Sequence, residues 1–120
     1  MDKAQAINAF WNSFDLPAYD ERTVPENVKM PYITYEMSTA SLDEPVLLSA
    51  NLYYSDTGWQ AITQKGKQIE AFIKAMVPIK IDEGRVFIST SAPFSQRLEE
   101  PEDRLIRRLL LNIYVEFLTN

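Results

Sequence analysis

The sequence predicts an α+β fold: a single, mostly antiparallel sheet of about five strands, covered by a long central helix and preceded by an amino-terminal helix. Two patterns support this fold: one long helical stretch with apolar residues on one side, and several runs in which apolar and polar residues alternate. The length of 120 residues and the 46% hydrophobic content suit one domain with one core, spanning residues 1–120. The expected element order is α-β-β-α-β-β-β.

The amino-terminal helix is expected from Met1 to Phe14, where Ile7, Phe10 and Trp11 fall on one face. A helix this short is marginal alone, so it must pack on the domain or on a neighbouring subunit. Residues Leu16 to Pro31 contain three prolines and no sustained period, which predicts an exposed connection. Residues 1–30 therefore form a helix and loop, with an arm between subunits as a second interpretation.

Two strands are expected next, at Tyr32–Ser38 and Val46–Tyr54, because aromatic and β-branched residues alternate with polar ones. The chain turns between them at Ser41 to Pro45, so they are predicted to form a hairpin.

The central helix is expected from Ser55 to Met76. Its apolar residues recur at steps of three and four, which places them on one side: Trp59, Ile62, Gly66, Ile69, Phe72, Ile73 and Met76. Ser55, Asp56 and Thr57 are all candidate helix caps, and the sequence does not choose among them. Gly66 costs about 1 kcal/mol in a helix relative to alanine. Its place on the apolar side predicts a close approach between helix and sheet.

The last third of the chain predicts three more strands. Val77–Ile81 and Arg85–Thr90 flank a short acidic turn with a glycine, which predicts a second hairpin. Ser91–Arg104 contains two prolines and an acidic cluster and is predicted to be a second long loop. Leu105–Leu118 alternates at period two and is predicted to be the longest, central strand, with its odd-numbered residues beneath the helix.

Composition argues against most enzyme classes. The chain contains no cysteine and no histidine, which removes thiol and imidazole nucleophiles, disulfides and the commonest metal ligands. The net charge of -5 argues against broad nucleic-acid binding, and no glycine-rich phosphate loop is present. No apolar run reaches the roughly 20 residues of a membrane span. We therefore expect a soluble, unexported protein without a cofactor or metal.

The charged residues allow two interpretations that the sequence leaves open. The acidic residues lie in predicted loops, where they are explained by solvated turns, although paired carboxylates also serve acid–base catalysis. The arginines after the acidic cluster either pair with their neighbours or contact another subunit. Phe87 is predicted to point away from the apolar face of its strand, toward a partner. The candidate interface residues are Asp20, Glu21, Arg22, Phe87, Glu99, Glu100, Glu102, Asp103, Arg104, Arg107 and Arg108.

Four segments together resemble the tail terminator, or tail-completion, proteins of long-tailed bacteriophages. They are PYITYEM, the Tyr53-Tyr54-Ser55 strand end before Trp59, APFSQRLEEPEDRLIRR and the closing NIYVEFLT. The resemblance extends from Pro31 to Thr119 and includes no catalytic signature. It provides no binding residue to carry over.

This resemblance implies a non-enzymatic virion protein at the head–tail interface, made in the host cytoplasm. The subunits would form a ring, commonly a hexamer, that caps the tail tube and contributes to the head–tail joint. The implied partners are further copies of the chain, the tail tube protein and the head–tail connector protein. No cofactor, membrane or specific nucleic acid is implied, although DNA passes through such a ring. Exposed loops and spare strand edges would then serve as ring contacts.

Two other functions remain open from the sequence. The chain suits a small acidic regulatory module, of phage or host origin, that captures a protein through its acidic loop. An enzyme acting through paired carboxylates would require one carboxyl group with a raised pKa in a cleft.

Overall fold

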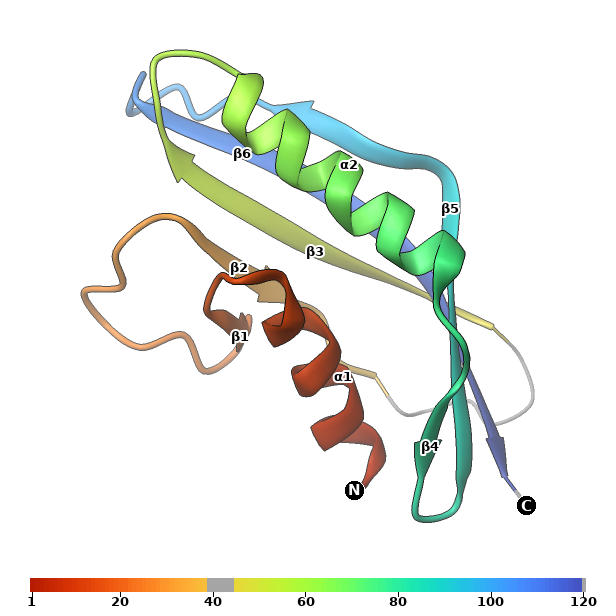
Figure 1. Ribbon diagram of the computed structural model, residues 1–120. Coiled ribbons are helices and arrows are strands. Elements are labelled where there is room, and N and C mark those ends of the chain that lie inside the picture. Colours follow the sequence, from red (N-terminus) through yellow and green to blue (C-terminus); the bar gives the residue numbers. More distant parts are fainter. Residues whose placement is uncertain (39–44, 120) are drawn as a thin grey trace.

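The computed structural model describes residues 1–38 and 45–119, which form two helices on one face of a six-stranded sheet (Figure 1). The strands lie in the order β1-β2-β3-β6-β5-β4. The elements are α1 (Lys3–Trp11), a 3-10 turn η1 (Asn12–Phe14), β1 (Ala18–Asp20), β2 (Tyr32–Tyr35), β3 (Val46–Ser55), α2 (Gln60–Ala75), β4 (Ile79–Ile81), β5 (Gly84–Leu98) and β6 (Ile106–Thr119).

The predicted single, mostly antiparallel sheet of five strands under a long helix is wrong. The sheet has six strands and curls into a half-barrel, and it is mixed because β1 pairs with β2 in parallel. Strand β1 is only three residues long and lies within the segment predicted to be an irregular connection. Three residues are too few to show an alternating pattern, so only pairing with β2 defines this strand.

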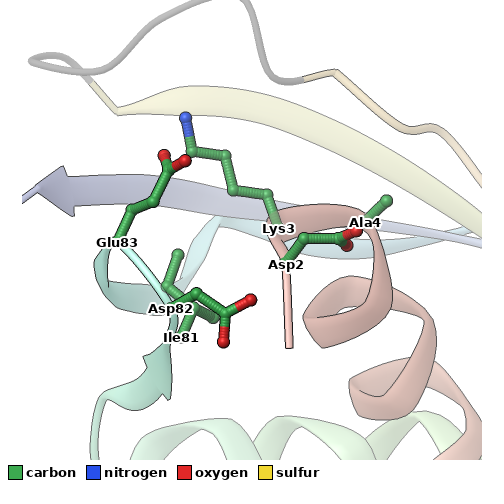
Figure 2. Close-up of a pocket in the computed structure, with 6 residues that line it drawn as sticks. All are labelled: Asp2, Lys3, Ala4, Ile81, Asp82 and Glu83. Carbon is green, nitrogen blue, oxygen red and sulfur yellow. The ribbon is translucent and has the colours of Figure 1, made fainter.

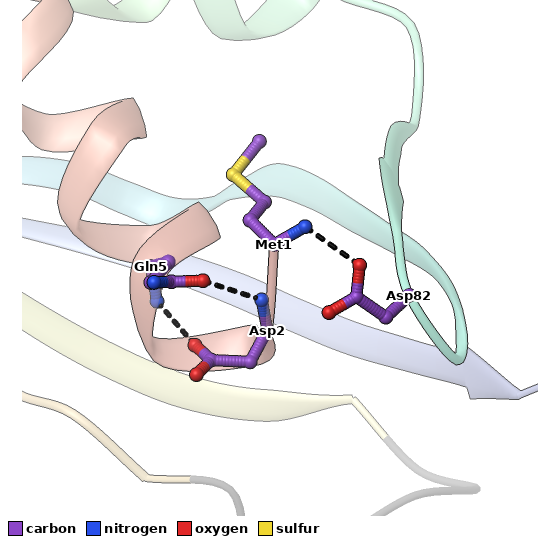
Figure 3. A network of polar contacts seen from close by, with 4 residues as sticks. All are labelled: Met1, Asp2, Gln5 and Asp82. Carbon is purple, nitrogen blue, oxygen red and sulfur yellow. Dashed lines mark hydrogen bonds and ion pairs between the residues drawn. The ribbon is translucent and has the colours of Figure 1, made fainter.

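The first helix buries the face that its sequence predicts. Ile7, Phe10 and Trp11 are buried in the core together with residues of all the longer strands. Asp2 caps the helix, because its carboxylate accepts from the Gln5 backbone N–H at 2.8 Å while the Gln5 side chain accepts from the Asp2 N–H at 2.9 Å (Figure 3). Residues 1–14 therefore form part of the domain core, and a role as an arm between subunits stays a prediction.

The chain start is fixed to the hairpin of β4 and β5. The Met1 ammonium lies 2.7 Å from Asp82 Oδ1, and the Asp82 backbone N–H donates to the Met1 carbonyl at 2.9 Å (Figure 3). These two contacts join the beginning of α1 to the turn after β4.

Helix α2 begins at Gln60, later than predicted, and none of the three candidate caps starts it. Trp59 occupies the N-cap position without a side-chain cap bond. Ser55 instead ends β3, and the Asp56 carboxylate accepts from the Gly58 N–H at 3.2 Å, within the preceding turn. A polar residue that can cap a helix can equally stabilise a turn, and Asp56 stabilises the turn.

The close approach of α2 to the sheet is confirmed, and its buried side is confirmed at four of the seven predicted positions. Ile62, Gly66, Ile69 and Ile73 are buried, whereas Trp59 and Met76 are partly buried and Phe72 is 44% exposed. A Cβ atom built on Gly66 would lie 2.7 Å from Cδ2 of Leu109 on β6, so only a residue without a side chain fits there without a shift.

Both predicted hairpins are confirmed. Strands β2 and β3 pair antiparallel, and of the turn predicted between them at Ser41 to Pro45, residues 41–44 lie outside the described residues. Strands β4 and β5 also pair antiparallel, with Ile81 opposite Gly84. Gly84 has a φ of 158°, close to fully extended backbone.

The predicted second loop at Ser91–Arg104 is wrong over its first half. Strand β5 continues to Leu98 and pairs with β6, with a shift of register between Thr90 and Ser95. Pro93 lies inside this irregular stretch, where a missing N–H breaks no regular ladder bond. Pro93 therefore lies in a bulge of β5, and the strand continues beyond it.

Strand β6 is central, as predicted, but it is not the longest, because β5 has 15 residues and β6 has 14. It pairs with β3 on one side and β5 on the other. Its odd-numbered residues under the helices are buried: Leu109, Leu111, Ile113, Val115 and Phe117.

Candidate assembly surfaces

The predicted interface residues fall in three separate places. Asp20, Glu21 and Arg22 lie at the end of β1 and in the turn after it. Phe87 lies on β5, directly opposite Glu116 of β6, on the face of the sheet that the helices leave uncovered. The residues from Glu99 to Arg108 surround the start of β6. The structure therefore does not unite them into one site.

The Arg108 side chain contacts three residues of its own chain. Its Nη1 lies 3.3 Å from Glu100 Oε1, its Nε donates to Asn51 Oδ1 at 2.8 Å, and its guanidinium lies 5.8 Å from the centre of the Tyr53 ring. This favours the interpretation that the acidic cluster and the following arginines pair locally, at least for Glu100 and Arg108. Glu99, Glu102 and Asp103 remain exposed in the turn.

Arg108 ends a row of aromatic side chains across the uncovered face of the sheet. The ring centres of Tyr19 and Tyr32 lie 6.4 Å apart, and those of Tyr32 and Tyr53 lie 5.0 Å apart in a stacked arrangement. Burial, with smaller contributions from Tyr53 and the charge of Glu100, raises the pKa of the Tyr32 hydroxyl. These ring contacts are those of side chains that pack between neighbouring strands.

Trp59 holds two arginines beside the start of α2. The guanidinium carbons of Arg97 and Arg107 lie 5.1 and 5.2 Å from the centre of the Trp59 ring. Arg107 also donates to the carbonyl oxygens of Arg104 and Thr57, at 2.7 and 2.9 Å. The adjoining cleft of about 340 Å³ is lined by Trp59, Glu99, Glu100, Pro101, Arg104, Ile106 and Arg107. Charges of both signs meet there, so the cleft selects neither anions nor cations.

The outer edge of β1 is protected against a further strand. The Asn12 side chain accepts from the Ala18 N–H at 3.0 Å and donates to the Ala18 carbonyl at 3.2 Å, in the place of a neighbouring strand. At the other edge, β4 pairs with β5 only as far as Val86, and β5 continues to Leu98 with an irregular stretch between Thr90 and Ser95. The predicted contacts through spare strand edges are therefore closed at β1 and stay a prediction at the other edge.

The uncovered face of the sheet carries four exposed apolar side chains, which we call the sheet patch. Leu47, Phe87, Tyr114 and Leu118 are each 39 to 52% exposed. Leu47 lies opposite Tyr114 across β3 and β6, and Leu118 lies opposite Arg85. The patch therefore follows the second half of β6 and spans three neighbouring strands.

The helix side carries an apolar groove of about 620 Å³, which we call the helix groove. It lies between α1, the second half of α2 and the chain leading to β4. Phe72 forms part of its wall, 5.1 Å from the Phe14 ring centre and 44% exposed. Its lining is Met1, Ala6, Ala9, Phe10, Ser13, Phe72, Ala75, Met76, Val77, Pro78 and Ile79, with no ionisable side chain.

A smaller pocket of about 290 Å³ lies beside the first turn of α1 (Figure 2). Asp2, Lys3, Asp82 and Glu83 give it charges of both signs. The carboxylates of Asp2 and Asp82 already hold the helix cap and the chain start. Within residues 1–38 and 45–119, no group of three or more carboxylates is placed to hold a metal ion.

Sequence reasoning missed Leu47, Tyr114 and Leu118. The signal was present in β6, whose even-numbered positions include Leu110, Tyr114 and Leu118 as well as polar residues. The even-numbered face of β6 is therefore mixed, because Arg108, Asn112 and Glu116 alternate with these apolar residues.

Comparison with protein-family models and with curated proteins found no match to this chain. None of the helices in the described part of the chain is long and apolar enough to cross a membrane.

Proposed function

We propose that this chain is a non-enzymatic structural protein of a bacteriophage virion. Its subunits form a ring, with six copies as the expected number, that caps the tail tube and contributes to the head–tail joint. The partners are further copies of the chain, the tail tube protein and the head–tail connector protein. The protein acts in the virion without a cofactor, after synthesis in the host cytoplasm.

The sheet patch is the observation that supports an assembly role. Four large apolar side chains lie exposed on the uncovered face of one sheet, with Arg85 and Glu116 among them, and a gathering of apolar and charged side chains suits a protein contact. The resemblance of the segments between Pro31 and Thr119 to tail terminators supplies the identity of the assembly. The absence of cysteine and histidine supports a role without covalent chemistry.

The test combines native mass spectrometry with electron microscopy of purified tail tubes. Wild-type protein is expected to form rings or to cap tube ends. A Tyr114→Lys variant is expected to lose capping, because it places a charge in the sheet patch. Leu105→Lys is the matched control, since Leu105 is 51% exposed but lies outside the patch. Protein that neither forms rings nor binds tubes at any ratio contradicts the proposal.

A second candidate is the acidic protein-binding module. It is favoured by Glu99, Glu102 and Asp103, three exposed carboxylates in one turn. Replacing all three with their amides would abolish capture of a host or phage protein if this function is correct, and would leave tube capping unchanged if the ring function is correct.

A further inference from the structure

Strand β5 changes the set of residues that it turns toward the helices at its bulge. Before the bulge, the even-numbered residues of β5, such as Ile88, pair with odd-numbered residues of β6, on the side that the helices cover. After the bulge, Ser95 lies opposite Leu111, and Arg97 lies opposite Leu109. A serine and an arginine therefore stand on the covered side of the sheet, where the paired residues of β6 are apolar.

A pocket of about 280 Å³ lies between this part of β5 and helix α2. The helix contributes Thr63, Lys67 and Glu70, whose spacing of four and three residues places them along one side of α2. The strand contributes Ser95 and Arg97. Polar side chains from two elements therefore converge on one hollow beside the apolar core.

The Arg97 guanidinium is held in place but has no hydrogen-bond acceptor. Its carbon lies 5.1 Å from the centre of the Trp59 ring, and a ring offers no acceptor oxygen. Within residues 1–38 and 45–119, the guanidinium makes no hydrogen bond and no ion pair. The Lys67 ammonium likewise has no such partner in these residues. Two positive charges at the pocket are therefore without a counter-charge of their own.

The other polar groups of the pocket leave this positive charge in excess. Thr63 Oγ1 is buried and has no hydrogen-bond partner in the described part of the chain, which calls for a ligand or a water there. Glu70 supplies the one carboxylate of the lining, and it lies 3.8 Å from Lys74 Nζ, one turn along the helix. The cleft beside Trp59 differs, because two acidic and two basic residues line it.

We propose that this pocket binds the carboxylate of an acidic side chain from a partner protein. Arg97 and Lys67 supply charge-assisted donors, and the Thr63 hydroxyl supplies a third donor. Trp59 holds the guanidinium in advance, which lowers the cost of ordering it on binding. The site does not depend on the proposed ring, since it is defined by the group that is bound and the residues that bind it.

Charge and size both favour one carboxylate on a protein. Two cations and one carboxylate leave one positive charge at the pocket, which matches a carboxylate and not a phosphate dianion. The volume lies just below the range of about 300 to 1,000 Å³ that is usual for small-molecule sites, so the pocket suits a single side chain. Lys67, Ser95 and Arg97 are exposed, so the surface of another protein can reach them.

NMR titration of the full chain with the blocked peptide acetyl-Ala-Glu-Ala-amide, at constant ionic strength, measures the binding. Saturable shifts are expected at the amides of Thr63, Lys67 and Arg97 and at the Arg97 Nε–H, with a dissociation constant of about 1 to 10 mM. Acetyl-Ala-Gln-Ala-amide has the same shape without the charge and is expected to give no saturable shift. The proposal is overturned if the Glu peptide gives none, or if the two peptides bind alike.

Two arginine variants locate the binding. Arg97→Gln removes the guanidinium and is expected to weaken binding of the Glu peptide by about tenfold or more. Arg85→Gln is the matched control, because Arg85 is an exposed arginine of the same strand and lies opposite Leu118, on the uncovered face. It is expected to bind like the wild type. Thermal melting checks folding, and Lys67→Gln replaces Arg97→Gln if the latter does not fold. Unchanged binding in the pocket variant overturns the proposal.

Acetate and inorganic phosphate distinguish the source of the anion. The Glu peptide is expected to bind more tightly than either at the same ionic strength, because the peptide backbone adds contacts at the mouth of the pocket. Acetate that binds as tightly as the peptide would assign the pocket to a small free carboxylate. Phosphate that binds more tightly would assign it to a phosphate group. Either result overturns the assignment to a side chain of a partner protein.

Discussion

A Cβ atom on Gly66 would lie 2.7 Å from Cδ2 of Leu109, which fixes how closely α2 approaches the central strand. We expect Gly66→Ala to lower the free energy of unfolding by about 1 to 3 kcal/mol, because overpacking a buried site exceeds the gain in helix propensity of about 1 kcal/mol. Urea denaturation measures this. Gly58→Ala is the matched control, since nothing lies within 4 Å of a Cβ there, and it is expected to be close to neutral. An equal or higher stability of Gly66→Ala would contradict the close approach.

Removing the Asn12 side chain is expected to open the outer edge of β1. Asn12→Ala loses both hydrogen bonds to Ala18, at a cost of about 1 to 2 kcal/mol in the free energy of unfolding. Hydrogen exchange of the Ala18 amide should accelerate. Asn8→Ala is the control. It removes a hydrogen bond from the Asn8 side chain in α1 to the Tyr35 hydroxyl in β2 and should leave exchange at Ala18 unchanged. Equal protection of Ala18 in both variants would show that Asn12 does not close the edge.

Arg108 and Arg104 are expected to differ although both follow the acidic cluster. Arg108→Ala removes contacts to Glu100, Asn51 and Tyr53, so we expect a loss of about 1 to 2 kcal/mol, with the ion pair itself discounted for its partial exposure. Arg104→Ala removes an exposed side chain and should stay within about 0.5 kcal/mol of the wild type. Chemical denaturation in low and high salt compares them. Equal losses would contradict the local pairing.

Tyr32 and Tyr54 are expected to ionise later than free tyrosine. Burial raises the pKa of the Tyr54 hydroxyl above 10.0, and burial together with Tyr53 and Glu100 does so for Tyr32. A raised pKa in the folded protein contributes stability that is full below pH 10 and is lost as the pH rises through the folded pKa. In an ultraviolet titration, the Tyr54→Phe variant and the Tyr32→Phe variant should each show one late-ionising hydroxyl fewer than the wild type. The assignment is contradicted if the hydroxyl that a variant has lost ionised at the ordinary pKa of tyrosine in the wild type.

The sequence predicted the elements whose pattern is long and regular. The buried side of α2, the buried odd-numbered side of β6 and both hairpins follow from periodicity over many residues. These patterns predict the structure correctly because each repeats over many residues, so that single residues that break the pattern do not hide it.

The errors arose where pairing between two segments, and not the pattern within one segment, decides the structure. Strand β1 exists because Ala18 to Asp20 pair with β2, and β5 continues past Pro93 because β6 supplies partners on the far side of the bulge. Neither partner can be identified from the local sequence. The candidate assembly surfaces differ in the same way. Alternation within one strand identified Phe87, whereas the helix groove is formed by α1, α2 and the approach to β4 together and has no pattern within any one of them.

The position of β6 in the middle of the sheet affects synthesis on the ribosome. Ser55 of β3 pairs with Ile106, and Gly84 of β5 pairs with Thr119, so neither earlier strand has its main partner until β6 has left the exit tunnel. Pairings this distant in sequence form slowly. Until β6 is made, the apolar side chains of β3 and β5 have no β6 side chains to pack against, a condition that favours aggregation of partly made chains.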